Sequence, residues 1–261
     1  MKKQSGERKI NSETQSQRDA TSVVKKTNNK PSPPLGDLGA RQIELKTKVK
    51  HNQNIKLKVC GMRENENILE LAKLLPDYMG FIFYGSSKRY AGEQLDAEVL
   101  ASLPASIIKT GVFVNENTEI IKATAHRYGL KAVQLHGEET PAVCAELKAF
   151  GLQVIKVVHV AAEVGWKSLE CYESVCDYFL FDTADASWGG TGRMFDWNIL
   201  KNYPSSKPFF LSGGIGIEQL PIPEFVLEKS LWAIDVNSRF EINPGLKDIE
   251  RIKRFKEELN A

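Results

Sequence analysis

From residue 55 onward, short runs of apolar residues alternate with longer segments of helical period. Eight such runs, rich in β-branched and aromatic residues, lie at 55–60, 79–84, 107–114, 132–136, 153–160, 178–183, 208–213 and 231–236. Between or after them, apolar residues recur at helical spacing in the segments 66–75, 117–129, 141–151 and 245–259. This alternation is typical of βαβ units and therefore of a parallel sheet.

Eight strands, each followed by a helical or loop crossover, match one compact (β/α)8 TIM barrel over residues 55–261. A doubly wound open sheet is the alternative arrangement of the same units. In a barrel, the active site lies on the loops at the carboxyl ends of the strands. The expected fold therefore says where the chemistry should be sought.

Residues 1–54 have a different composition, rich in Lys, Ser, Asn, Gln and Thr, without sustained periodicity. Such a segment buries too little apolar surface to offset its conformational entropy, so we expect a disordered extension. Residues 1–58 contain 14 Lys or Arg against 5 Asp or Glu, whereas the remainder of the chain is mildly acidic. The extension is a basic arm for anionic partners, a docking sequence, or simply solvated chain.

The acidic remainder argues against a nucleic-acid-binding surface on the barrel. No stretch is long and apolar enough to cross a membrane, and the first residues lack the features of a secretory signal, so we expect the cytoplasm. The four cysteines have no metal-ligand spacing and indicate free thiols in a reducing compartment.

Chemically reactive residues concentrate where the expected strands end, and two glycine-bearing loops are among them. Gly213 and Gly214 follow the seventh strand, and Asn237 and Ser238 follow the eighth. In many barrels the backbone of these two loops holds a phosphate group, and glycine lets it approach the anion. We therefore expect a phosphate site there.

Two further strand ends carry candidates for proton transfer. Cys60 ends the first strand, where a phosphate site and nearby cations would favour the thiolate and give a base. Asp182 ends an otherwise apolar sixth strand, and burial there would keep its carboxyl group neutral and able to donate a proton. Asp235 occupies the equivalent place in the eighth strand, and spacing alone leaves either carboxyl group as the acid.

Arg89 and His136 also follow strands. The planar guanidinium of Arg89 suits a substrate carboxylate, although an exposed Lys-Arg pair is usually only solvated. His136 can serve as an acid or base, or be a hydrogen-bonded histidine at a strand end. We expect both, together with Asp235, to contact the substrate.

Eight motifs in order resemble those of the phosphoribosylanthranilate isomerase family, over residues 55–258. They are KVCGM (58–62), GFIFYGSSKRY (80–90), GVFVNE (111–116), VQLHGEE (133–139), FDT (181–183), WGGTGRMFDW (188–197), LSGGI (211–215) and AIDVNSRFEINPGLKD (233–248). The resemblance implies an isomerase of tryptophan biosynthesis that uses no cofactor or metal. The implied ligand is a small molecule, phosphoribosylanthranilate. Barrels of this size are commonly monomers or homodimers, and we expect one of these two states.

The implied reaction is the Amadori rearrangement of N-(5-phosphoribosyl)anthranilate to a 1-deoxyribulose 5-phosphate product. By position, the resemblance makes Cys60 the general base, Asp182 the general acid and Arg89 the ligand of the anthranilate carboxylate. It places a mobile loop over the substrate at Gly189, Gly190, Thr191 and Gly192. Many members have Ser-Ser-Gly where this chain has Asn237-Ser238-Arg239, so Arg239 either contacts the phosphate or points to solvent.

Two other functions fit the same pattern less well. A sibling phosphosugar barrel is one, but the histidine-pathway isomerase would have Asp in place of Cys60, and indole-glycerol-phosphate synthase would have catalytic Lys and Glu residues at strand ends. The other is a non-catalytic barrel that binds partners through its basic extension. The presence of Cys60, Asp182 and Arg89 together favours the isomerase.

Overall fold

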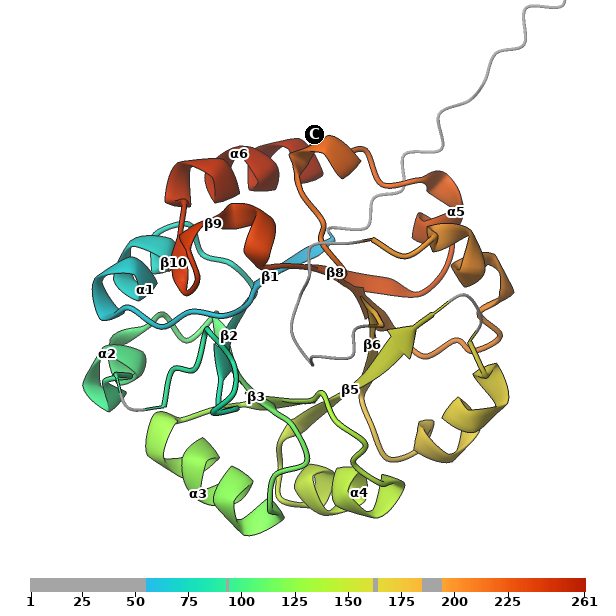
Figure 1. The fold of residues 1–261 in the computed structure, drawn as a ribbon, viewed down its shortest axis with the longest axis horizontal. Coiled ribbons are helices and arrows are strands. Elements are labelled where there is room, and N and C mark those ends of the chain that lie inside the picture. Colours follow the sequence, from blue (N-terminus) through green and yellow to red (C-terminus); the bar gives the residue numbers. More distant parts are fainter. Residues whose placement is uncertain (1–54, 93, 162–163, 185–193) are drawn as a thin grey trace, which may run out of the picture. The chain divides into compact units, whose positions relative to one another are not determined.

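The computed structural model describes residues 55–92, 94–161, 164–184 and 194–261. Within them, eight parallel strands pair in chain order and close into a barrel, because β1 pairs with β8 (Figure 1). The strands are β1 (Lys56–Val59), β2 (Tyr78–Ile82), β3 (Ile108–Phe113), β4 (Ala132–Leu135), β5 (Gln153–Val160), β6 (Tyr178–Thr183), β7 (Phe209–Leu211) and β8 (Leu231–Val236). The predicted (β/α)8 barrel is confirmed, and each strand lies within one of the eight predicted apolar runs or begins one residue before it.

Helices cover the outside of the ring of strands (Figure 1). They are α1 (Asn65–Ala72), α2 (Ala97–Ser102), α3 (Thr118–Tyr128), α4 (Pro141–Ala149), α5 (Glu224–Leu227) and α6 (Ile249–Leu259). The sequence marks the ends of α3 clearly. The side chain of Asn117 accepts a hydrogen bond from the backbone of Glu119, and Gly129 ends the helix in the left-handed conformation.

The crossovers after β5, β6 and β7 contain little or no α-helix in the described residues. Short 3₁₀ helices stand there instead: η1 (Trp166–Tyr172), η2 (Trp197–Asn202) and η3 (Ile217–Gln219). After β8, the 3₁₀ helix η4 (Ser238–Phe240) leads into the hairpin of β9 (Glu241–Asn243) and β10 (Leu246–Lys247). This hairpin supplies two charged residues to the site described below.

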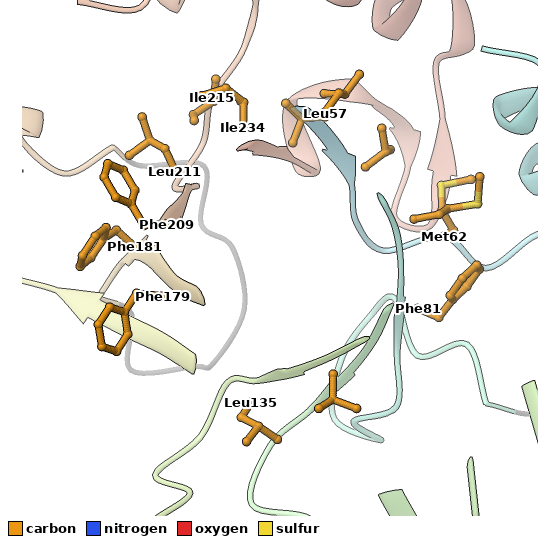
Figure 2. Packing of buried hydrophobic residues seen from close by; sticks show 14 of the residues in the cluster. Leu57, Met62, Phe81, Leu135, Phe179, Phe181, Phe209, Leu211, Ile215 and Ile234 are labelled. Carbon is orange, nitrogen blue, oxygen red and sulfur yellow. The ribbon is translucent and has the colours of Figure 1, made fainter. Parts of the chain in front are cut away.

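The buried hydrophobic residues form two clusters, one on the outer face of the strands and one on their inner face. The larger lies between the barrel and its helices and contains Phe179, Phe181, Phe209 and Leu211, whose side chains point away from the ring of strands in Figure 2. The smaller contains the alternating residues, among them Leu180 and Phe210, and therefore fills the barrel interior. Polar inward-facing residues follow these apolar ones along the strands, and they form the floor of the site.

Candidate active site

A pocket at the carboxyl ends of the strands brings together most of the predicted site residues. Cys60, Arg89, His136, Asp182, Asp235, Gly214, Asn237 and Ser238 all line it. Gly213 lies directly beside it in the chain, between two lining residues. The predicted mobile loop, residues 189–192, lies outside the described residues. The concentration of reactive residues at strand ends therefore corresponds to one site.

Cys60 lies at the bottom of this pocket and is almost fully buried. Glycine at position 80 makes room for it, because a Cβ there would lie 2.7 Å from the Cys60 Sγ. Lys58, two residues earlier on the same face of β1, is also fully buried. Its Nζ donates to Asp235 Oδ2 at 2.9 Å and to Gln134 Oε1 at 2.8 Å. The candidate base thus stands beside a buried ammonium group.

Burial raises the pKa of the Cys60 thiol, whereas the ammonium groups of Lys58 and Lys247 act to lower it. Burial alone would lower the pKa of Lys58, but the Asp235 carboxylate and Cys60 raise it above its ordinary value. Lys58 is therefore charged at neutral pH. The cations expected near Cys60 are present, and burial acts against the thiolate form.

Asp182 ends β6 on the pocket wall, with its side chain 17% exposed. Its Oδ1 accepts a hydrogen bond from the backbone of Thr183 at 2.9 Å, and its Oδ2 lies 3.7 Å from His136 Nε2. Burial, reinforced by electrostatic repulsion from His159, Lys58 and Lys156, lowers the pKa of His136 to about 3. A neutral imidazole therefore faces the candidate acid.

Arg89 approaches the pocket from the loop after β2. Its Nε and Nη2 donate to the carboxylate of Glu241 in β9, at 2.7–3.0 Å. These bonds occupy one edge of the planar guanidinium and leave Nη1 without a partner among the residues that the structure describes. The other edge can still grip a second carboxylate in the bidentate manner.

Lys247 of β10 connects Arg89 to the loop after β8. Its Nζ donates to Glu241 Oε1 at 2.8 Å and to Asn237 Oδ1 at 2.6 Å. Burial lowers the pKa of Lys247 to about 8, although Glu241 opposes this. Gly61, with φ of +77°, lets this group assemble, because a Cβ there would lie 2.8 Å from both Arg89 Cδ and Asn237 Oδ1.

The loop after β7 runs through Gly213 and Gly214 with φ of +94° and +72°, conformations that favour glycine. A Cβ on Gly213 would lie 2.6 Å from the Thr183 hydroxyl, so this loop packs tightly against the end of β6. Next to it, Asp235 is buried, and its Oδ1 has no hydrogen-bond partner in the described part of the chain. Burial raises the pKa of this carboxyl group, whereas Lys58, Lys247 and Ser212 act to lower it.

Arg239 is not among the described residues that line the pocket. Its side chain is 44% exposed, and its Nη1 lies 3.6 Å from Oε1 of Glu218 in η3. This contact is an exposed ion pair between the loops after β7 and β8.

Four residues that hydrogen-bond to the pocket residues were not assigned a role from the sequence. They are Lys58, Gln134, Glu241 and Lys247. The signal for the first two was present, because each lies two residues before an assigned residue, Cys60 or His136, and so faces the same side of its strand. Glu241 and Lys247 lie within the motif 233–248, but nothing in the sequence indicates which groups they contact. They reach the site only because the β9–β10 hairpin folds back toward Arg89.

The site offers a thiol and a carboxyl group on strands β1 and β6, and two places suited to anions. The described residues contain no group of three or more His, Cys, Asp or Glu side chains arranged to hold a metal ion. In the same ranges, the helices are too short or too polar to cross a membrane. The arrangement suits proton transfer to and from a substrate with a negative charge at each end.

Comparison with known proteins places these features in one family. A sequence model of N-(5'-phosphoribosyl)anthranilate isomerase matches residues 57–258. The enzyme of that name from Phocaeicola vulgatus is 48% identical over 201 residues, which cover 76% of this chain and 95% of the relative. Its namesake from Parabacteroides distasonis is 44% identical over 201 residues, covering 76% of this chain and 90% of the relative.

Solved structures agree with the sequence relatives. Phosphoribosyl anthranilate isomerase from Thermotoga maritima is 33% identical, with a TM-score of 0.67, over 78% of this chain and 98% of that one. Another structure of such an isomerase, in complex with reduced 1-(o-carboxyphenylamino)-1-deoxyribulose 5-phosphate, is 31% identical, with a TM-score of 0.62 and the same coverage. A third describes monomers generated from the dimeric Thermotoga enzyme, at 30% identity and a TM-score of 0.61, with that same coverage.

Proposed function

This chain belongs to the N-(5'-phosphoribosyl)anthranilate isomerase family, and on that premise we propose that Cys60 is its general base and Asp182 its general acid. The protein is an isomerase of tryptophan biosynthesis that catalyses the Amadori rearrangement of phosphoribosylanthranilate. Substrate and product are isomers, so the reaction needs no external electron donor or acceptor. The observation that supports the assignment is a single pocket lined by Cys60, Asp182, Arg89 and the loops after β7 and β8.

In the first step, the ribose ring opens. Asp182 in its neutral form donates a proton to the ring oxygen while the nitrogen lone pair forms the C1–N double bond and the C1–O bond breaks. The product of this step is a Schiff base that carries a positive charge on nitrogen. The partial burial of Asp182 and its position at the strand end support this role.

In the second step, Cys60 removes the proton from C2, which the adjacent iminium group has made acidic. The electrons of the C–H bond form the C1–C2 double bond of an enolamine, while the π electrons of the C1–N bond return to nitrogen. The ketose product forms when C1 gains a proton and the C2 hydroxyl group loses one. Each well-placed acid or base contributes a factor on the order of 10²–10⁴ in rate. Because burial raises the pKa of Cys60, we expect activity to increase with pH as this thiol ionises.

The two ends of the substrate would be held by different parts of the pocket. We assign the anthranilate carboxylate to the free edge of Arg89, and the apolar pocket residues Ile82, Val112 and Val114 to the aromatic ring. The phosphate would lie against Gly213, Gly214, Asn237 and Ser238, with Lys247 beneath Asn237 supplying positive charge. Asp235 would accept a hydrogen bond from a sugar hydroxyl through Oδ1, and His136 would stand beside Asp182. Grips at both ends would hold the reacting carbon between base and acid.

The test follows the fluorescence change of freshly prepared phosphoribosylanthranilate with the wild type, Cys60→Ser and Asp182→Asn. Each substitution should lower kcat by a factor on the order of 10² or more, while the wild-type kcat/KM should rise with pH. Cys171→Ser and Asp96→Asn are matched controls, because both residues are exposed on the outside of the barrel. Full activity in the two site variants would overturn the assigned roles, and no turnover by the wild type would overturn the function.

We also propose a cellular location, an oligomeric state and a role for residues 1–54. Four free cysteines suit the cytoplasm, where thiols stay reduced. The related enzymes include monomeric and dimeric forms, and we expect one of these two states here. Residues 1–54 are proposed to be an extension that takes no part in the reaction.

A further inference from the structure

We propose that Gln134 is a positioning residue that fixes the tautomer of His136, so that the neutral imidazole presents its Nε2–H toward Asp182. This inference rests on the proposed function, because it assigns a purpose to the direction of hydrogen bonds around the proposed acid. It concerns a chain of contacts from Lys58 on β1, through Gln134 on β4 and His136 directly after it, to Asp182 on β6.

The chain begins at Lys58, whose ammonium group can only donate hydrogen bonds. Its Nζ lies 2.8 Å from one terminal atom of the Gln134 amide, and that atom must therefore be the carbonyl oxygen. A flipped amide would set two donors against each other in a fully buried place, which is strongly unfavourable. Asp235, at 2.9 Å from the same Nζ, keeps the ammonium charged and fixed.

With its oxygen facing Lys58, Gln134 turns its NH₂ group toward His136. Gln134 Nε2 lies 2.9 Å from His136 Nδ1, and because the amide nitrogen donates, Nδ1 must accept. A neutral imidazole has one N–H, so the proton of His136 is on Nε2. The nitrogen that bears this proton lies 3.7 Å from Asp182 Oδ2.

Neighbouring groups keep His136 neutral. Lys58, Lys156 and the ring of His159 surround it, and His159 Nε2 lies 3.0 Å from the His136 carbonyl oxygen, which accepts its hydrogen. The side chain of His136 is 13% exposed, so a further positive charge there would be poorly solvated. Among the described residues, the carboxyl group of Asp182 lies on the Nε2 side of the imidazole, with Oδ2 3.7 Å from Nε2.

The direction of the Nε2–H matters because Asp182 changes charge during the reaction. When Asp182 gives its proton to the ring oxygen it becomes a carboxylate, and an N–H aimed at it stabilises that new charge. The opposite tautomer would turn a nitrogen lone pair toward the carboxylate and repel it. Gln134 also lines the pocket, so its replacement should affect the chemical step more strongly than substrate binding.

The first measurement needs no substrate. In protein labelled with ¹⁵N-histidine, two-bond ¹⁵N–¹H correlations distinguish Nδ1–H from Nε2–H, and His136→Gln identifies the signals of His136. We expect neutral Nε2–H for His136 from pH 5 to pH 9. An Nδ1–H tautomer, an even mixture or an imidazolium at pH 7 would overturn the proposal.

The second measurement reverses the hydrogen bond without removing it. Gln134→Glu keeps an oxygen for Lys58 but replaces the donor to His136 by an acceptor, so the imidazole proton should move to Nδ1 or both nitrogens should be protonated. We expect kcat to fall at least about tenfold, by a larger factor than any rise in KM that the added negative charge in the pocket lining causes. Gln94→Glu, the same change on an exposed loop residue, should retain the wild-type tautomer and kcat.

A retained Nε2–H in folded Gln134→Glu, or a changed tautomer with wild-type kcat, would overturn the proposal. The spectra of the resting protein separate this question from the proposed function. If the wild type shows Nε2–H but does not turn over phosphoribosylanthranilate, the function fails and the tautomer assignment stands. If it turns over the substrate with the Nδ1–H tautomer, the function stands and this inference fails.

Discussion

Three buried lysines, each paired with a buried carboxylate, lie on or just below the reactive face of the barrel. Lys58 pairs with Asp235, Lys156 with Glu139 and Lys247 with Glu241, at 2.8–2.9 Å. Burying such pairs costs desolvation free energy, and apolar residues of the same size would often give a more stable protein. Their value lies in orientation, since each ammonium group also donates to a residue or loop that forms the pocket.

At the same scale, His136 makes the stability of the protein depend on pH. In the folded protein its pKa is about 3, whereas an unfolded histidine titrates near its ordinary value of about 6.5. Below pH 6.5 the unfolded chain binds a proton at this histidine and the folded protein does not. The free energy of unfolding therefore decreases as the pH is lowered, by at most about 1.4 kcal/mol per pH unit. Between pH 6.5 and 4.5, urea unfolding should show a loss about 2 kcal/mol larger for the wild type than for His136→Gln.

The exposed residue His126 on α3 supplies the control for this measurement. His126→Gln should keep the pH dependence of the wild type, because its side chain is solvated in both states. An equal loss of stability in the wild type and in His136→Gln would show that His136 binds its proton normally in the folded protein.

Sequence reasoning located single residues well where the strand end alone decides their direction. Cys60, His136, Asp182 and Asp235 follow from this rule, and all of them line the pocket. It could not reveal that Arg89 is held by Glu241, because that contact joins residues 152 positions apart through a hairpin with no distinctive pattern. The sequence also could not show how the pKa of Cys60 is shifted. Burial raises this pKa and the neighbouring lysines lower it, and both effects depend on packing.

At the scale of elements, the turn between β1 and α1 packs against two other loops, those after β2 and β8. Gly61 is in the left-handed region, and an added methyl group would meet both Arg89 and Asn237. We expect Gly61→Ala to cost about 1 kcal/mol or more in unfolding free energy through strain. It should also raise KM severalfold, because it displaces the proposed carboxylate and phosphate grips, as steady-state kinetics will show.

Gly151, after α4, is the matched control for this substitution. Its φ is +97°, but a Cβ there would meet no atom within 4 Å. Gly151→Ala should therefore carry the backbone cost without the steric one and leave KM unchanged. If both variants have the wild-type KM, Gly61 does not shape the substrate site.

The strands were predictable because eight apolar runs recur at regular intervals, and each run had to be buried on both faces. The helices α1, α3, α4 and α6 were also predictable from their period. The 3₁₀ crossovers η1, η2 and η3 were not, because short turns are stabilised by local packing against the barrel rather than by an amphipathic repeat.

At the scale of the whole molecule, the basic extension and the acidic barrel should be separable. The first strand begins at Lys56, and the family resemblance also begins at that strand. We expect deletion of residues 1–50 to leave kcat/KM and the thermal unfolding midpoint unchanged, measured by the fluorescence assay and by circular dichroism. A large loss of either would show that the extension packs on the barrel.

Deletion of α6 is the contrasting experiment at the other end of the chain. This helix buries Ile252 and Phe255 completely, and Phe255 packs edge-on against Phe240. Its removal should unfold the barrel, because large apolar side chains of the outer core would lose their cover. The two truncations together test the expected domain boundary.

The closure of the barrel by β1 and β8 has a consequence for how the enzyme is made. Lys58 and Asp235 meet in this pairing, although 177 positions separate them along the chain. A ribosome delivers the first strand long before the last, so the growing polypeptide holds a lysine whose counter-ion has not yet been synthesised. The buried Lys58–Asp235 pair of the proposed site can therefore form only after translation has nearly ended.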